Sequence, residues 1–452
     1  MAETHVQTLA TQPERKELPR VLGLLDVVGI VIGSVIGSGI FIVPAAIAAQ
    51  VKSPLLIFAV WLTGGTLSFF GALSFAELGA AFPQAGGMYV YLRESYGPLV
   101  SFLFGWTLFL VIDSGTVATL AVAFSAKYLP YFLPLTKLET KLIAIGLIAF
   151  LAAVNFVGVR WGALLQNLLT LVKVAAVIGM SAVVFLLARG NTAHFVSPSP
   201  PRFSWNLVGA FGIAMVASLW AYKGWEAVTF SAGEIKNPQR YLPLGLLVGT
   251  ALIATLYFVA NLAYLYVLPS PVIARSERIA TDVMRIAIGP LGASIVALVI
   301  LFSIAGAANG NVLTSPRVYY AMARDRLFFR RVADVHPRFL TPHFAILAMG
   351  AWSAVLSASG TFEELFTYVI FGQWIFFGLT VGAVLILRKK RPDIARPYRT
   401  WGYPWTPIIF ILSALFISLS SLINQFRNAL AGLVIILLGV PAYFFWKKKA
   451  GS

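Results

Sequence analysis

About twelve apolar stretches, each long enough to cross a lipid bilayer as an α-helix, recur along this sequence. Hydrophobic residues make up 59% of its 452 residues and charged residues only 11%, a balance that is foreign to soluble globular domains. The stretches lie near residues 24–49, 54–80, 98–129, 138–158, 162–187, 206–232, 241–267, 290–320, 341–360, 364–386, 405–424 and 426–446. The sequence therefore predicts an all-α polytopic membrane protein with 12 transmembrane helices.

The positions of the charges predict a membrane topology rather than nucleic-acid binding, although the formal net charge is +17. If the N-terminus is cytoplasmic, the segments rich in Lys and Arg at 321–340, 388–399 and 447–449 are cytoplasmic too, as the positive-inside rule requires. The first 20 residues are polar and do not resemble a cleavable signal peptide. We expect a multi-pass protein of the plasma (cell inner) membrane with both termini in the cytoplasm.

Glycines interrupt the first apolar stretch. Gly33, Gly37 and Gly39 lie near its middle, and Pro44 follows them. A helix that unwinds there exposes N–H and C=O groups at membrane depth, which persist only where they line a cavity or bind a ligand. A zwitterionic ligand suits both kinds of backbone group, because the N–H groups bind its carboxylate and the carbonyls bind its ammonium. The competing interpretation is that Gly33 and Gly37 form a close-packing face between two intact helices.

A second interruption occurs in the sixth apolar stretch, where Lys223, Gly224 and Glu226 follow one another closely. Lys223 and Glu226 are three residues apart and share a face if the helix is intact. Trp220 and Trp225 flank this point, and an aromatic ring beside a break in the membrane can cover a bound solute. Packing is the alternative explanation for both rings, and it fits Trp225 better.

The two interrupted stretches hold matching positions in two blocks of five, residues 24–187 and 206–386. Interruptions at corresponding places in two halves are the sequence signature of an inverted-repeat transporter. This match favours a broken helix over close packing at the first-stretch glycines.

Polar residues in three further stretches are expected to face the protein interior. Asp113 either faces a cavity or a partner, or is a protonated group bonded to a neighbouring helix. Lys173 lies about 15 Å from either membrane surface at ~1.5 Å per residue, too deep for a snorkelling side chain. Its predicted partners are carbonyls of a broken helix or hydroxyls of a facing one. Ser303, Gly306 and Asn309 suit a cavity wall.

At these residues the sequence resembles the amino acid–polyamine–organocation superfamily, on the side of the L-type amino acid transporters. The resemblance extends from about residue 22 to residue 404 and rests on several motifs in the family's order. They are Gly37-Ser38-Gly39-Ile40-Phe41, the loop from Pro83 to Tyr91, Gly233 through Arg240, Arg317 through Arg326, and Arg396-Pro397-Tyr398-Arg399. Each motif alone is a weak signal, and all of them together are a strong one.

The resemblance implies a five-plus-five inverted-repeat (LeuT-like) fold with helices 1 and 6 broken and two further helices. The implied divisions are a tail at 1–20, a first repeat at 21–187, an outer loop at 188–205, a second repeat at 206–387, a cytoplasmic loop at 388–404, helices at 405–446 and a tail at 447–452.

The resemblance also implies a substrate site between the first, third, sixth and eighth helices. The residues expected to bind the substrate are Val35, Ile36, Gly37, Ser38, Gly39, Ile40, Trp220, Lys223 and Gly224. Lys173 matches the lysine that stands in for a sodium ion in the L-type branch, and Ser303 and Asn309 match polar positions of the eighth helix. Glu226 matches a glutamate of arginine/agmatine-type antiporters.

This chain has a lysine at position 223, where similar bacterial sequences often carry Asp, Gly or another non-basic residue. If Asp113 or Glu226 pairs with it, the site is close to neutral and suits neutral L-amino acids. If neither does, its ammonium recruits an acidic substrate.

The function expected from these observations is sodium-independent exchange or facilitated transport of neutral L-amino acids by alternating access. The alternatives are a proton-coupled amino acid symporter and a cationic amino acid or polyamine antiporter. An intramembrane enzyme is disfavoured, because three of the four histidines lie outside the apolar stretches and His343 lies at the edge of one, and no metal-ligand or nucleophile–base set is visible. We expect no cofactor, no metal and no nucleic-acid partner. Association with lipid is expected, and an accessory subunit or a second copy is left open.

Overall fold

The computed structural model describes residues 18–196, 203–359, 362–424 and 426–451, which are helical apart from loops and one isolated parallel bridge between Leu22 and Ile235. Most of the predicted tail at 1–20 lies outside the described residues. The helices longer than eleven residues are α1 (Leu24–Val35), α2 (Gly39–Val51), α3 (Pro54–Ala81), α7 (Lys137–Val157), α8 (Val159–Leu187), α9 (Trp205–Ala221), α10 (Pro238–Val267), α12 (Ile279–Thr314), α14 (His343–Ser359), α15 (Phe362–Lys390), α16 (Trp405–Asn424) and α17 (Phe426–Gly451).

Shorter helical elements complete the chain. They are α4 (Met88–Tyr96), α5 (Pro98–Thr107), η1 (Leu108–Ile112), α6 (Asp113–Val122), η2 (Ala123–Tyr128), η3 (Leu129–Tyr131), η4 (Thr192–Phe195), η5 (Trp225–Glu234), α11 (Ser270–Ile273), α13 (Pro316–Arg324) and η6 (Arg330–Ala333). The elements from α5 to η3 follow one another without a gap and form one continuous span.

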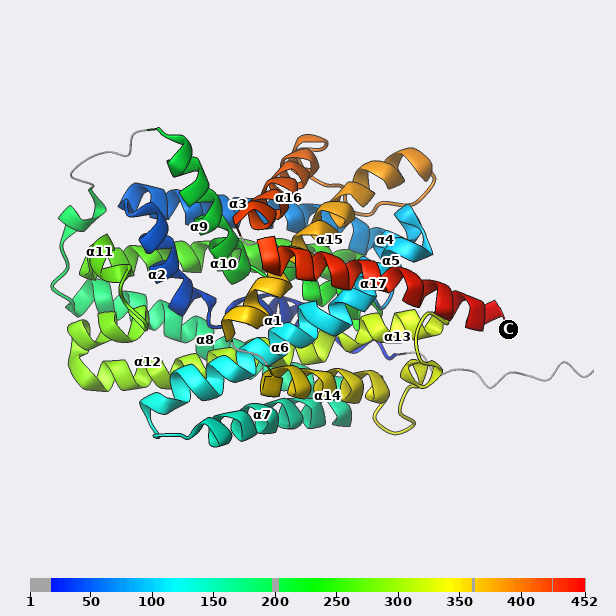
Figure 1. The fold of residues 1–452 in the computed structure, drawn as a ribbon, viewed down its shortest axis with the longest axis horizontal. Coiled ribbons are helices and arrows are strands. Elements are labelled where there is room, and N and C mark those ends of the chain that lie inside the picture. The colour runs from blue at the N-terminus through cyan, green and yellow to red at the C-terminus, as the bar shows by residue number, and fades with distance from the viewer. Residues whose placement is uncertain (1–17, 197–202, 360–361, 425, 452) are drawn as a thin grey trace, which may run out of the picture.

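Among the described residues, nine helices are long and apolar enough to cross a membrane, or ten if α1 and α2 form one bent span. The predicted all-α polytopic architecture is therefore confirmed, and the count of twelve stays a prediction. The long helices run side by side along the longest axis of the molecule (Figure 1). The broken first span lies at the centre of this arrangement, because α1 packs against α8, α10 and α12 and α2 packs against α9.

α12 differs from the predicted boundaries. It begins at Ile279, before the predicted start at residue 290, and it continues through a kink at Ile288 and Gly289, with Pro290 inside the helix. The motif expected to be a loop from Pro83 to Tyr91 contains the start of α4, which buries Met88 and Tyr89.

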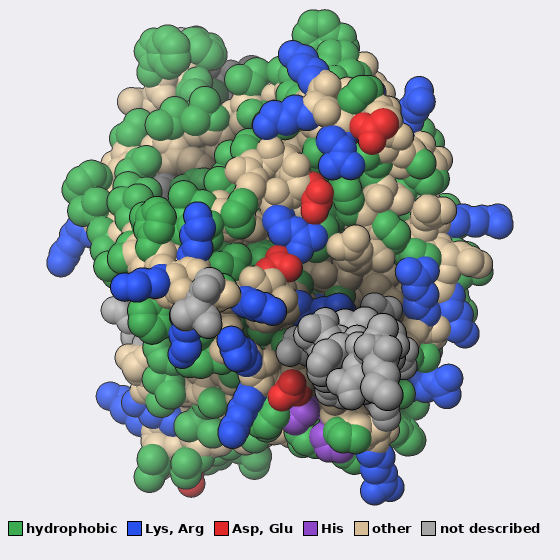
Figure 2. Space-filling model, turned by 90° about the vertical axis from the view of Figure 1, so that its right-hand side faces the viewer, with side chains coloured by type: hydrophobic (Ala, Val, Ile, Leu, Met, Phe, Trp, Pro, Cys, Tyr) green, Lys and Arg blue, Asp and Glu red, His purple; other side chains and the backbone are tan. Residues whose placement is uncertain are grey.

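One end of the molecule is strongly basic. Figure 2 shows many Lys and Arg side chains spread over the end at which α17 finishes, and few Asp and Glu side chains. Exposed members of this set include Arg324, Arg326, Arg330, Lys389, Arg399 and Lys447. This separation of charge fits the topology expected from the positive-inside rule.

A fully buried ion pair holds α13 against the end of η5. Arg317 Nε lies 2.5 Å and Nη2 2.9 Å from the two carboxylate oxygens of Glu234, and both side chains are 0% exposed. Arg317 also donates to the carbonyl of Leu313. The backbone carbonyl of Glu234 accepts from the N–H groups of Val21 and Leu22. The segment that enters α1 is thus tied to the segment that leaves the sixth span.

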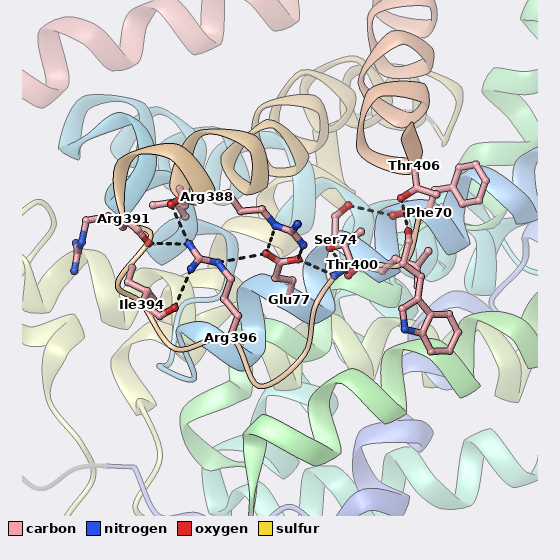
Figure 3. Close-up of polar contacts among 12 residues, drawn as sticks. Phe70, Ser74, Glu77, Arg388, Arg391, Ile394, Arg396, Thr400 and Thr406 are labelled. Atoms are coloured by element: carbon pink, nitrogen blue, oxygen red, sulfur yellow. Dashed lines mark hydrogen bonds and ion pairs between the residues drawn. The ribbon is translucent and has the colours of Figure 1, made fainter. Parts of the chain in front are cut away.

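A second polar cluster joins α3 to α15 and to the loop before α16 (Figure 3). The buried carboxylate of Glu77 accepts from Arg388 Nε at 2.9 Å and Nη2 at 2.6 Å, and from the backbone N–H of Thr400 at 2.7 Å. Arg396 Nε lies 3.6 Å from the same carboxylate, and its Nη atoms donate to carbonyls near the end of α15. One carboxylate therefore fixes three segments at the basic end.

Removing one partner of the Arg317–Glu234 pair should destabilise the protein by about 3–5 kcal/mol, because the remaining charge stays buried without a counter-ion. We expect Glu234→Gln and Arg317→Met each to lower the thermal midpoint in detergent, and the double variant Glu234→Leu/Arg317→Met to regain part of the loss. Glu94→Gln, which removes a partly exposed partner of Arg93, serves as the control and should cost at most about 1 kcal/mol. A double variant that loses as much as the two single losses combined would show that the two residues do not act as a pair.

Candidate functional site

The first span is interrupted over residues 36–38. α1 ends at Val35, α2 begins at Gly39, and the two helices are bent by 41° relative to each other. The backbone in the break turns sharply, with the Gly37 N–H donating to the carbonyl of Val35 at 2.8 Å. The remaining carbonyls at this point are left without partners within the helix and need donors from elsewhere.

Lys173 supplies most of those donors from α8. Its ammonium donates to the carbonyls of Gly33 at 2.8 Å, Ile36 at 2.6 Å and Ser303 at 3.0 Å, and its side chain is fully buried. Ser303 Oγ, on α12, lies 3.1 Å from the carbonyl oxygens of both Ile36 and Gly37. All three ammonium protons thus meet backbone oxygens, and the charge is held behind the break.

The sixth span is interrupted next to the first break. α9 ends at Ala221 and the 3-10 helix η5 starts at Trp225, with Gly224 between them at φ 122°. A Cβ atom on Gly224 would lie 2.8 Å from the carbonyl oxygen of Ser34, and one on Gly39 would lie 2.8 Å from the Cα of Ala221. The two broken segments therefore touch through their backbones, and glycine is required at both contacts.

Tyr257 of α10 connects the two breaks, a role that no sequence pattern indicated. Its buried hydroxyl lies 3.1 Å from the carbonyl oxygen of Val35 and 3.1 Å from that of Ala221. These carbonyls end α1 and α9 respectively. One side chain therefore serves the last turn of both interrupted helices.

Asp113 is the partner of Lys223. Lys223 Nζ lies 3.1 Å from Asp113 Oδ1 and 2.9 Å from Thr116 Oγ1, and both members of the ion pair are almost fully buried. Ser315 donates to the other carboxylate oxygen of Asp113 at 2.5 Å. Asp113 directly follows the π-helical turn η1, a distortion that is frequent at functional sites.

Glu226, the other expected partner, does not pair with Lys223. Its carboxylate accepts from the backbone N–H of Gly224 at 3.0 Å and from Gln373 Nε2 at 2.8 Å. The expectation of a shared helix face was wrong because the chain between Lys223 and Glu226 is a turn that leads into a 3-10 helix. Glu226 instead caps the turn at Gly224.

A small cavity of about 30 Å³ lies between the two breaks. Its lining comprises Ser34, Val35, Gly37, Ser38, Gly39, Thr116, Leu120, Trp220, Ala221, Lys223, Gly224, Ala307 and Asn311. A space of this size holds about one or two water molecules. A larger solute therefore enters only when the surrounding helices move apart.

Unpartnered polar groups face this region from the first break. Ser34 Oγ and Ser38 Oγ are buried, and neither has a hydrogen-bond partner within the described part of the chain. Gly39 and Ile40 begin α2, where backbone N–H groups lack partners inside the helix. Hydroxyls and N–H groups at a helix N-terminus form a site suited to a carboxylate.

Seven of the nine residues expected to bind substrate line the cavity; they are Val35, Gly37, Ser38, Gly39, Trp220, Lys223 and Gly224. The side chains of Ile36 and Ile40 are instead buried in the apolar core. Among the lining residues that were not predicted, Ala307 and Asn311 continue the face of α12 that begins at Ser303, at intervals of four residues.

Asn309 does not lie with Lys173 or in the cavity wall, contrary to expectation. Its Nδ2 donates to the carbonyl of Gly162 at 3.1 Å and to Gln166 Oε1 at 2.9 Å, and its Oδ1 accepts from Asn155. Side chains two positions apart in a helix point to nearly opposite faces. Asn311 therefore lines the cavity, whereas Asn309 contacts α7 and α8.

Comparisons with known proteins match nearly the whole chain. A family model of amino acid permeases matches residues 22–440. The b(0,+)-type amino acid transporter 1 of Mus musculus is 32% identical over 99% of this chain and 93% of its own length. The serine/threonine exchanger SteT of Bacillus subtilis (strain 168) is 32% identical over 97% of this chain and 99% of its own, and the human cystine/glutamate transporter is 31% identical over 96% and 87%. The family-model match includes both breaks and every residue that lines the cavity.

Proposed function

Because the chain belongs to the amino acid permease family and is an amino acid transporter rather than an enzyme, we propose that it moves small or medium neutral L-amino acids by sodium-independent exchange or facilitated transport. The observation that carries this proposal is the meeting of two broken helices at a cavity whose lining ammonium, that of Lys223, is paired with Asp113. The family also makes it a multi-pass membrane protein. The basic end, at which α17 finishes, lies on the cytoplasmic side in this proposal, and both termini are expected on that side of the membrane.

The two ends of the first break give the substrate its orientation. The N-terminus of α2 carries a partial positive charge, and the C-terminus of α1 a partial negative charge. The substrate carboxylate binds the N–H groups of Gly39 and Ile40 with the Ser34 and Ser38 hydroxyls, and its ammonium binds carbonyls at the end of α1. These contacts recognise only the α-ammonium and α-carboxylate groups, which all amino acids share.

Lys173 replaces a coupling sodium ion in this mechanism. Its ammonium already occupies the position between three carbonyl oxygens, at distances of 2.6–3.0 Å, where a bound cation would otherwise neutralise the break. Because the charge of Lys173 is part of the protein, transport in this mechanism needs no sodium gradient. Transport is therefore expected to depend on amino acid gradients alone.

The pairing of Lys223 with Asp113 favours neutral substrates. The ammonium beside the cavity already has a carboxylate at 3.1 Å, so it does not recruit an acidic side chain. A bacterial relative is named a serine/threonine exchanger, which agrees with a small neutral substrate.

Proton-coupled symport is the second candidate, and Glu226 favours it. This buried carboxylate holds the turn at Gly224 in the second break, so gaining or losing a proton would change the hydrogen bonding of the break. Uptake that an inward proton gradient accelerates, and that Glu226→Gln makes independent of the gradient, would favour this candidate over exchange.

Counterflow of L-alanine in proteoliposomes should proceed equally in sodium and in choline buffers. Lys173→Ala should remove most of this activity, because the carbonyls of Gly33 and Ile36 lose their donor while the protein still folds. Lys137→Ala, at an exposed lysine at the start of α7, is the control and should keep full activity. Sodium-stimulated uptake by the unmodified protein would contradict the assignment of Lys173, and uptake without counterflow would exclude a carrier.

Asp113→Asn should raise the uptake of L-glutamate relative to L-alanine, because Lys223 is then left without its carboxylate. Lys223→Gln should change the uptake of alanine, leucine and glutamate modestly and uniformly. The double variant tests whether the gain of glutamate uptake needs the ammonium. Selective loss of glutamate uptake in Lys223→Gln would show that the ammonium binds substrate rather than Asp113.

Trp220→Ala should weaken apparent affinity or turnover by about tenfold or more, the effect of losing roughly 1.4 kcal/mol, because its ring borders the cavity. Trp225 instead packs between Phe75 and Phe377, with ring centroids 4.9 and 5.5 Å away. Trp225→Ala should therefore cost about 3–5 kcal/mol of stability and change transport per folded molecule little. Uptake kinetics and thermal midpoints of both variants separate the two roles, and identical kinetics would reject a gate at Trp220.

A further inference from the structure

A second pocket, remote from the two breaks, lies at the basic end of the molecule. It has a volume of about 440 Å³ and is lined by Arg326, Phe328, Phe329, Arg330, Trp446, Lys449 and Ala450. These residues come from the loop after α13, from η6 and from the last turns of α17. None of them lines the cavity between the breaks or belongs to the clusters of Glu77 and Glu234.

The charge of this pocket selects an anionic ligand. Three of its seven lining residues are basic and none is acidic. The nearby Asp325 does not offset this charge, because its carboxylate is engaged by Arg93 at 2.7 Å and by the hydroxyl of Tyr89 at 2.8 Å. Arg326 and Arg330 are exposed, and two guanidinium groups facing one concavity match the oxygen atoms of a phosphate.

The floor and the surroundings of the pocket are aromatic. The rings of Phe329 and Trp446 meet edge to face with centroids 4.9 Å apart, and Phe328 lies against both, 5.2 Å from Phe329 and 6.2 Å from Trp446. Phe329 is 61% exposed, and Phe444 and Phe445 on the same turn of α17 are 56% and 63% exposed. Exposed phenylalanine rings at the end of a membrane-spanning helix are suited to contact with lipid chains, and Trp446 is of a residue type enriched at the depth of the lipid headgroups.

We propose that this pocket binds the phosphate headgroup of an anionic phospholipid, with Arg326 and Arg330 on the phosphate and the lipid chains along Phe444 and Phe445. Basic pockets beside membrane helices are suited to such headgroups. The bound lipid joins α17, which stands outside the predicted repeats, to the loop that follows α13. This role is independent of the substrate and of the coupling mechanism.

Native mass spectrometry of the full chain, purified free of lipid in detergent and titrated with phosphatidylglycerol or phosphatidylcholine, tests the proposal. We expect one retained phosphatidylglycerol per chain and clearly weaker retention of phosphatidylcholine. Arg326→Gln/Arg330→Gln should weaken retention of phosphatidylglycerol by at least about tenfold, since both guanidinium groups that contact the phosphate are removed. The single variant Arg330→Glu gives the same test if the double variant does not fold.

The matched control is Lys389→Gln/Arg399→Gln, which removes two exposed charges from the same end outside the pocket. This control should retain phosphatidylglycerol as the unmodified protein does. An equal loss in the control would show that the charge acts diffusely and would overturn the proposal. Equal retention of phosphatidylcholine, or equally tight binding of soluble glycerol phosphate, would overturn it as well, because the first needs no anionic headgroup and the second needs no membrane.

Discussion

The broken first span depends on one buried ammonium. Unpaired carbonyls in the membrane interior cost several kcal/mol each, and an isolated lysine there costs about 2.5–3.5 kcal/mol even on a lenient scale. The unwound backbone at Ile36 and the charge of Lys173 are each unfavourable alone at this depth. Together they satisfy each other, because three carbonyl oxygens surround the ammonium at 2.6–3.0 Å. The carbonyls of the break therefore find their donor within the chain itself.

The position of the second break depends on its contacts with the first. Gly224 and Gly39 allow backbone atoms of the two segments to approach where any side chain would collide, and Tyr257 bonds to the last turn of both α1 and α9. The cavity lies at this junction, so its shape depends on how the two broken spans sit against each other. A displacement of either span changes the cavity directly.

How much of this was predictable depends on the surroundings of each residue. The inward position of Lys173 could be predicted, because an ionisable side chain in the middle of a long apolar stretch is rarely stable outside the protein interior. The two broken spans could be predicted from the glycines and charged residues that interrupt them. The partner of Lys223 was not predictable, because spacing along a helix favours Glu226 only if the helix continues. Tyr257 was missed for a different reason. A tyrosine in an apolar helix has the same sequence context whether it packs or bonds.

The cluster around Glu77 has a consequence for how the chain is made. Glu77 ends an early helix, while Arg388 lies 311 residues later in the chain. At synthesis rates of roughly 5–20 residues per second, the carboxylate waits roughly 15 to 60 s for its guanidinium partner. During that interval α3 is already inserted and its end must remain in contact with water. The arrival of α15 and of the loop before α16 then brings Arg388, Arg396 and Thr400 to one early acidic residue, and α16 and α17 follow.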